Sequence, residues 1–232
     1  MNQQLKELYN SKWQELYRSI EPLISDDIKV IKPASPLLIS LDDNEDYEKS
    51  DIKIMVVGQE TNGWHNVFEK DPIAILDSYY HFITRGECWS YGGQFWNGVK
   101  RFVNLLKNKY PNKSVGFVWN NLVKIGKSSD KGFPPNYIYQ VEKQYFNVLK
   151  EEIEILKPDI VLFISGPNYD FVLFDKLGDL TLKEVESFTK RELSILQVEN
   201  IKFAFRTYHP NYLWRVGIDK YFNAILDRIE IQ

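Results

Sequence analysis

The chain has 232 residues, 44% hydrophobic and 26% charged, a globular composition that excludes a mainly disordered chain. Its 29 Lys and Arg residues against 32 Asp and Glu give a net charge of -3, which excludes a generally basic nucleic-acid coat protein but allows a local basic patch. The one cysteine, Cys88, cannot build a disulfide framework, a cysteine zinc site or a cysteine-ligated iron–sulfur cluster within the chain. We expect a cytoplasmic protein without a membrane span, because no run approaches about 18 apolar residues.

Hydrophobic spacing predicts an N-terminal helix over residues 4–24, then a long connection with two prolines and the acidic stretch Leu41–Asp51, expected to be a solvated loop. Three short apolar runs predict buried strands, at residues 52–58, 115–121 and 159–166. Helical spacing predicts helices at residues 66–84, 93–109 and 138–157, a short helix after Asn168 and a last helix over residues 212–229. Two strand-like runs, LSILQVE and KFAFRTY, precede that last helix.

Apolar strands that alternate with helices are typical of a parallel sheet covered on both faces. The pattern predicts an α/β fold with three layers, α/β/α, around a central, mostly parallel sheet. We expect one domain over residues 1–232, with the helix and connection in residues 1–50 and the α/β core in residues 51–232. Ligands of such sheets collect at the carboxyl ends of the strands. Polar or glycine-containing peptides follow the predicted strands at four places: GQETNGW at 58–64, NNLVK at 120–124, SGPN at 165–168 and YHPNYLWR at 208–215.

Three kinds of side chain at this edge could carry chemistry. Gly58 is expected to let the chain leave its strand sharply, so that Glu60 lies at the edge. The carboxylate there can orient or deprotonate a water or face a developing cation, or it caps the next helix. A neutral His209 can donate to a substrate oxygen, or it bonds to a backbone carbonyl. The amide of Asn121, or of Asn120, matches the donor and acceptor edge of a nucleobase, although asparagines are also common in turns.

Other classes of chemistry lack their motifs. The chain has no GxxxxGK[ST] loop, no GxGxxG opening a helix after a strand and no GxSxG elbow. No histidine or carboxylate pair has the spacing of metal ligands.

Together these peptides resemble the uracil-DNA glycosylase superfamily. GQETN at 58–62 looks like its first motif, and three peptides are similar to its thermostable bacterial and archaeal branch: NLVK at 121–124, KPDIVLFISG at 157–166 and TYHPNYLWR at 207–215. The set stands in the family's order from residue 54 onward. The first motif departs from the pattern, with Glu60 and Thr61 where other members carry Asp and Pro, and the iron–sulfur cysteines of the thermostable branch are absent.

The resemblance implies a DNA glycosylase that hydrolyses the N-glycosidic bond of uracil or a related damaged pyrimidine in DNA, without a cofactor or metal. By this likeness Glu60 stabilises the cationic sugar and orients the water. His209, helped by the backbone N–H of Gln59, stabilises the base as it leaves with negative charge. Asn121 reads the pairing edge of the base, with Asn120 as the second choice.

The likeness also addresses the shape of the pocket. Asn62 stands where one branch has a tyrosine that blocks bulky C5 substituents, so we expect a pocket that tolerates C5-modified bases. The segment between Trp64 and Gly92 does not align clearly with the family. Trp89 is the first choice for the ring that stacks on the base, with Tyr91 and Phe95 as alternatives.

DNA is the expected partner, and DNA binding needs positive charge. Residues 100–131 hold eight Lys and Arg residues against one Asp. Four residues directly after the asparagine peptide are the first candidates for phosphate contacts: Lys124, Lys127, Ser128 and Ser129. Arg215 and Arg206, near the histidine motif, come second. The same stretch also fits a solvated helix face followed by a loop.

Three other interpretations stay open. The same fold could form a non-catalytic protein that binds a nucleobase, a nucleotide or DNA, which the unusual first motif and the acidic net charge favour. A hydrolase of free nucleosides or nucleotides would need the pocket but not the basic residues. The resemblance could also reflect the fold alone.

Overall fold

The computed structural model describes residues 1–26, 31–41, 46–65, 67–178 and 180–231. The prediction of a loop at Leu41–Asp51 therefore lies partly outside the described residues, and its last part contains a short helix, α2 (Asp46–Lys49). Among the described residues, none of the helices combines the length and the apolar character that crossing a membrane requires.

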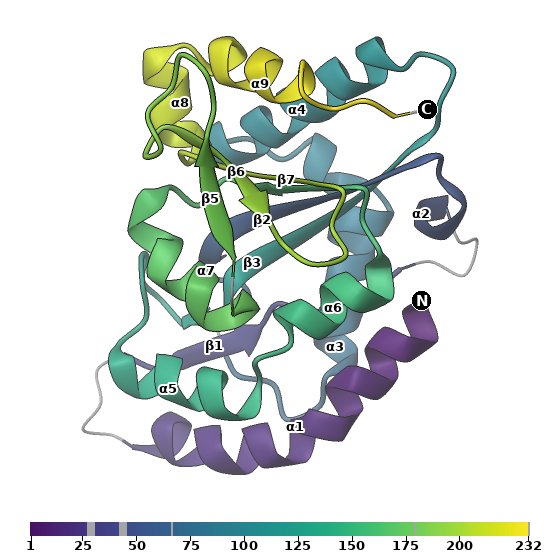
Figure 1. The fold of residues 1–232 in the computed structure, drawn as a ribbon. Coiled ribbons are helices and arrows are strands. Elements are labelled where there is room, and N and C mark those ends of the chain that lie inside the picture. Colours follow the sequence, from purple (N-terminus) through teal and green to yellow (C-terminus); the bar gives the residue numbers. More distant parts are fainter. Residues whose placement is uncertain (27–30, 42–45, 66, 179, 232) are drawn as a thin grey trace.

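The described strands form one seven-stranded mixed sheet in the order β1-β3-β2-β4-β7-β6-β5 (Figure 1). Their bounds are β1 Pro33–Pro36, β2 Ile52–Asn62, β3 Val115–Lys127, β4 Ile160–Phe163, β5 Thr181–Glu184, β6 Leu193–Gln197 and β7 Phe203–Thr207. The four central strands β3, β2, β4 and β7 run parallel to one another, whereas β1 pairs antiparallel with β3 at one side and β6 and β5 pair antiparallel at the other. This confirms a sheet that is mostly parallel in its centre.

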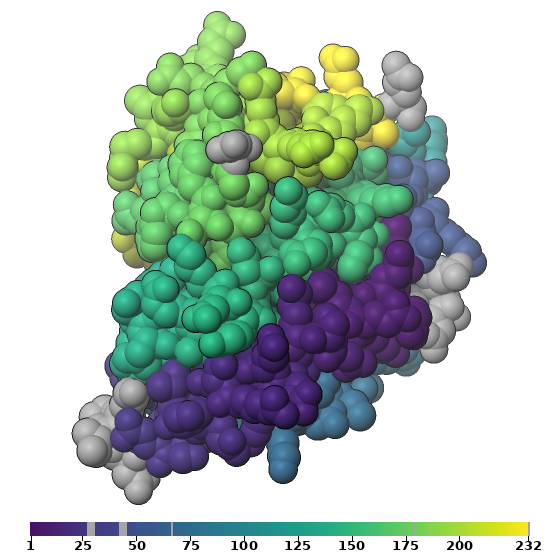
Figure 2. All heavy atoms as spheres, turned by 60° about the horizontal axis from the view of Figure 1, so that its bottom comes forward, coloured from purple at the N-terminus to yellow at the C-terminus, as the bar shows by residue number. Residues whose placement is uncertain are grey.

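Helices cover both faces of the sheet, in three layers (Figure 1). One face carries α1 (Asn2–Ser25), α5 (Asn136–Tyr145) and α6 (Leu149–Leu156), and the other carries α4 (Gln94–Lys109), α8 (Pro210–Val216) and α9 (Ile218–Leu226). Figure 2 shows α1 along the outside of its layer, beside the teal and green residues of α5 and α6. The remaining helical segments are α3 (Ile73–Tyr79), a π-helix (Tyr80–Thr84), two 3-10 turns (Glu87–Trp89 and Pro167–Tyr169) and α7 (Asp170–Leu177).

Two of the predicted helices are interrupted in the structure. The helix expected over 138–157 breaks at Phe146, which leaves the helical conformation and buries its ring against Tyr9 and Trp13, at centroid distances of 6.1 and 6.2 Å. The helix expected over 212–229 breaks at Gly217, whose φ of 92° lies in the left-handed region that glycine adopts without strain. Local spacing predicts the helical segments, but packing decides where they end.

The sequence pattern missed two edge strands. β1, with the sequence PASP, lies in the predicted connection and pairs with the last residues of β3. Proline cannot donate to a strand ladder, and an edge position tolerates this loss. β5 forms the opposite edge and is mostly exposed, so it lacks the apolar alternation that marks a strand.

Candidate functional site

β2 does not leave the sheet at Gly58, contrary to the expectation, but continues to Asn62 with an irregularity after Glu60. Gly58 lies beside Asn121 of β3 in the parallel register. A Cβ atom on Gly58 would lie 2.4 Å from the Asn121 side-chain oxygen and 3.2 Å from the Phe95 ring. Glycine is needed here because two side chains approach the backbone closely, not because the chain turns.

Asn121 presents a polar amide that is buried without a complete set of partners. The residue is 1% exposed, and among the described residues its Nδ2 has no hydrogen-bond acceptor. An unpaired buried donor costs about 1–3 kcal/mol, so such groups call for a water or a ligand. The amide lies next to Gly58 and the Phe95 ring. Among the residues at this edge, its unpaired donor gives the clearest indication of a bound water or ligand.

Phe95, near the start of α4, connects this amide to the histidine. Its ring lies 5.6 Å from the His209 ring, centroid to centroid, at an interplanar angle of 30°. Trp89, the first choice for the stacking ring, packs instead on Phe117 at 5.1 Å. Phe117 pairs with Ile54 near the beginning of both strands, so Trp89 lies at the other end of the sheet, and the structure corrects that choice. The alternative Tyr91 is 61% exposed and contacts Phe82.

His209 is held in one tautomer. It is the N-cap residue of α8, and its Nδ1 accepts a hydrogen bond from the Asn211 backbone N–H at 3.1 Å. Burial lowers the pKa of His209, which favours the neutral ring. A neutral ring whose Nδ1 accepts carries its proton on Nε2 and can donate it to a ligand oxygen.

Glu60 is half-buried and already holds a partner. Its carboxylate accepts a hydrogen bond from the hydroxyl of Tyr169, in the 3-10 turn that follows β4. Burial raises the pKa of Glu60, while the Tyr169 hydrogen bond and the positive charge of Lys127 oppose this rise. Tyr169 was not among the predicted site residues, although it follows the SGPN peptide directly. Its position just after a strand end is the feature of the sequence that could have indicated it.

Gln59 and Asn62, which were both predicted to lie at the base, have different surroundings in the structure. The Gln59 amide donates to the Ser165 backbone oxygen at 2.7 Å and so ties β2 to the end of β4. Gly166 then approaches His209, since a Cβ atom on it would lie 4.0 Å from the His209 backbone nitrogen. Asn62 is exposed at the last position of β2, opposite Lys127, and its packing gives no support to a role in shaping a pocket.

Asn120 points away from Asn121, into a buried polar network. Its Nδ2 donates to a Glu152 carboxylate oxygen at 2.9 Å, and its oxygen accepts from the Asn121 backbone N–H at 2.8 Å and from the Lys124 ammonium. The Tyr9 hydroxyl also donates to Glu152, at 2.6 Å. Asn120 is fully buried and committed to these partners, so the structure corrects its assignment as the second reader of a base.

Lys124 belongs to the same network. Its side chain is 0% exposed, and its ammonium lies 2.7 Å from the Glu152 carboxylate. The prediction that Lys124 contacts DNA phosphates is therefore corrected, because a fully buried ammonium cannot reach them. Arg206 is likewise 1% exposed and donates to Asp170 at 3.0 Å.

The other expected phosphate contacts lie nearer the surface. Lys127 is mostly buried and pairs with Asp130 at 3.1 Å. The Ser128 backbone N–H donates to the Lys32 oxygen at 2.9 Å, and Arg215 is exposed in the last turn of α8. Elsewhere in the basic stretch Arg101 pairs with Asp219 at 2.8 Å. Of the positive residues of 100–131, Lys124 is thus buried, and Lys127 and Arg101 are paired with acidic residues.

No group of three or more histidine, cysteine or acidic residues in the described part of the chain could hold a metal ion. A comparison with protein-family models finds no match, and a comparison with curated proteins finds no similar sequence.

Proposed function

We propose that this protein is a DNA glycosylase on a uracil-DNA glycosylase-like fold, which hydrolyses the N-glycosidic bond of uracil or a related damaged pyrimidine. The motif resemblance and the mostly parallel central sheet support this proposal. So does the gathering of Gly58, Asn121, Phe95 and His209 near the carboxyl ends of the central strands.

The observation that carries the proposal is the unpaired amide of Asn121. A glycosylase extrudes its nucleotide into a pocket, where a base is read by hydrogen bonds to its edge and by stacking on an aromatic ring. The Asn121 Nδ2 supplies a free donor, and the Phe95 ring beside it supplies an apolar face. A reader of this kind rejects a wrong base strongly, since a mismatch leaves buried polar groups unpaired.

In the proposed reaction the bond between C1′ and the base nitrogen breaks, and its electron pair stays on the base. His209 donates from Nε2 to a base oxygen and so stabilises the developing negative charge. Glu60, when ionised, faces the cationic sugar and orients a water, whose oxygen then bonds to C1′ and whose proton passes to solvent or to the departing base. The Tyr169 hydroxyl fixes the Glu60 carboxylate.

The test is base release from a short DNA duplex with one uracil opposite guanine, in which alkali reveals the abasic site. We expect release by the native protein, and loss of release in Glu60→Gln and His209→Ala. Trp89→Phe is the matched control, because Trp89 packs on Phe117 away from the site and should leave release unchanged. No release by the folded native protein would overturn the proposal, and release that survives in both site variants would overturn the roles of Glu60 and His209.

A second candidate is a non-catalytic protein that binds a nucleobase, a nucleotide or DNA with the same residues. The burial of Lys124 and Arg206 removes two expected phosphate contacts, so within this candidate it favours a nucleobase or nucleotide over DNA as the ligand. Uracil binding in calorimetry without base release, abolished by Asn121→Ala, would identify this function.

A further inference from the structure

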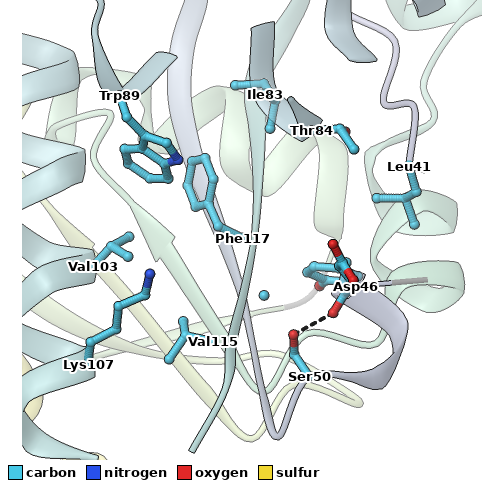
Figure 3. Close-up of a pocket in the computed structure, with 12 residues that line it drawn as sticks. Leu41, Asp46, Ser50, Ile83, Thr84, Trp89, Val103, Lys107, Val115 and Phe117 are labelled. Atoms are coloured by element: carbon cyan, nitrogen blue, oxygen red, sulfur yellow. Dashed lines mark hydrogen bonds between the residues drawn. The ribbon is translucent and has the colours of Figure 1, made fainter. Parts of the chain in front are cut away.

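A pocket lies on the same face of the sheet as Asn121 but at the opposite end, where β3 begins (Figure 3). It has a volume of about 180 Å³ and is lined by residues of α2, the π-helix, the 3-10 turn at Glu87–Trp89, α4 and β3. Drug-sized ligands occupy pockets of about 300–1,000 Å³, so this pocket fits a molecule of one ring. None of the residues assigned to the candidate functional site lines it, apart from the corrected choice Trp89.

One side of the pocket combines aromatic rings with a positive charge. The rings of Trp89 and Phe117 lie 5.1 Å apart at 51°, and Figure 3 shows the Lys107 ammonium on their side of the pocket. The structure gives Lys107 no ion pair or hydrogen bond among the described residues, and the side chain is exposed. An aromatic wall beside an unpaired ammonium suits a flat ring that carries an anionic group.

The other side of the pocket is polar. Asp46 and Ser50 lie across from Lys107 in Figure 3, and Tyr47 also lines the pocket. Tyr47 is 5% exposed, and its hydroxyl is buried and not open to the pocket. The Ser50 hydroxyl donates to the Asp46 backbone oxygen at 2.6 Å, so its oxygen and the Asp46 carboxylate can accept a hydrogen bond from a ligand hydroxyl.

We infer that this pocket is a binding site for a small aromatic carboxylate, with the carboxylate at Lys107, the ring against Trp89 and Phe117, and a hydroxyl toward Asp46 and Ser50. The inference does not depend on the proposed glycosylase activity. It assigns a function to Trp89, which was the first choice for the ring that stacks on the base.

The test is calorimetric titration of the full chain with benzoate, 4-hydroxybenzoate and benzylamine. We expect both carboxylates to bind, 4-hydroxybenzoate more tightly, and benzylamine to bind at least tenfold more weakly. Lys107→Met should weaken benzoate about tenfold, the loss of one charge-assisted hydrogen bond. Lys150→Met, at an exposed helical lysine outside the pocket, is the matched control and should bind benzoate as the native protein does.

A nuclear magnetic resonance experiment locates the ligand. The indole N–H signal of Trp89, assigned by its absence in Trp89→Phe, should shift when benzoate is added. Asn121→Ala should leave this shift unchanged, which separates the pocket from the candidate functional site. Absence of benzoate binding at millimolar concentration, equal binding of benzylamine, an unmoved Trp89 signal or an unchanged affinity in Lys107→Met would each overturn the inference.

Discussion

Removal of the Lys124 ammonium tests whether the buried network on β3 is a part of the core. Lys124→Met would leave the Glu152 carboxylate, 0% exposed, without its cation. Loss of one partner of a buried ion pair costs about 3–5 kcal/mol. Glu152 keeps the donors of Tyr9 at 2.6 Å and Asn120 at 2.9 Å, so we place the loss near the lower limit, about 3 kcal/mol.

The assay is urea unfolding at neutral pH, with thermal unfolding beside it. A loss of about 3 kcal/mol should lower the melting temperature of a chain of this size by roughly 6–12 °C. The double variant Lys124→Met/Glu152→Gln should recover most of the loss, because no charge then stays buried. Lys12→Met is the matched control and should cost less than about 1 kcal/mol, since Lys12 pairs with Glu151 at the surface.

A loss below about 1 kcal/mol in Lys124→Met would refute this reasoning. It would show that the ammonium reaches water, and the assignment of Lys124 as a phosphate contact would then return. A double variant that is no more stable than the single one would also count against the ion pair.

Three further predictions concern the site. Tyr169→Phe removes a hydrogen bond that lowers the pKa of Glu60, so this pKa should rise. The acid limb of base release plotted against pH should then move to higher pH. An acid limb that does not move would contradict the contact between Tyr169 and Glu60. Gly58→Ala should cost about 1–3 kcal/mol in urea unfolding and abolish uracil binding, because its methyl group meets the Asn121 oxygen; native affinity would contradict this. Phe95→Ala should weaken binding of uracil-containing DNA by about 1–3 kcal/mol in fluorescence anisotropy, and an equal loss with undamaged DNA would contradict stacking.

Much of the fold could be predicted from the sequence. The runs that became β2, β3 and β4 are apolar and short, and periodicity identifies such strands directly. β1 and β5 were not predicted, because edge strands need no apolar face. The end of α5 was not predicted, because Phe146 leaves the helical conformation to pack against distant residues. These features depend on contacts between segments that are distant in the chain.

Only a part of the candidate site could be predicted from the sequence. The sequence predicts that Glu60, Asn121 and His209 each come at a strand end, and the rule for parallel sheets then places them at one edge. In the structure Glu60 and Asn121 lie within β2 and β3, and only His209 follows its strand, β7. Nothing in single residues shows which side of a strand faces a pocket. Asn120 and Asn121 are adjacent, yet one enters a buried ion network and the other keeps a free donor. Lys124 carries the same sequence signal as an exposed lysine, and only its packing shows that it is buried.

The measurement that tests the central claim most directly is single-turnover base release from the uracil duplex by the native protein and by Asn121→Ala. The account predicts release by the native protein and a loss of at least about tenfold in the variant, while its urea unfolding changes little. Equal release by both proteins would contradict the assignment of Asn121 as the reader of the base. No release by a folded native protein that still binds uracil would contradict catalysis and leave the binding function.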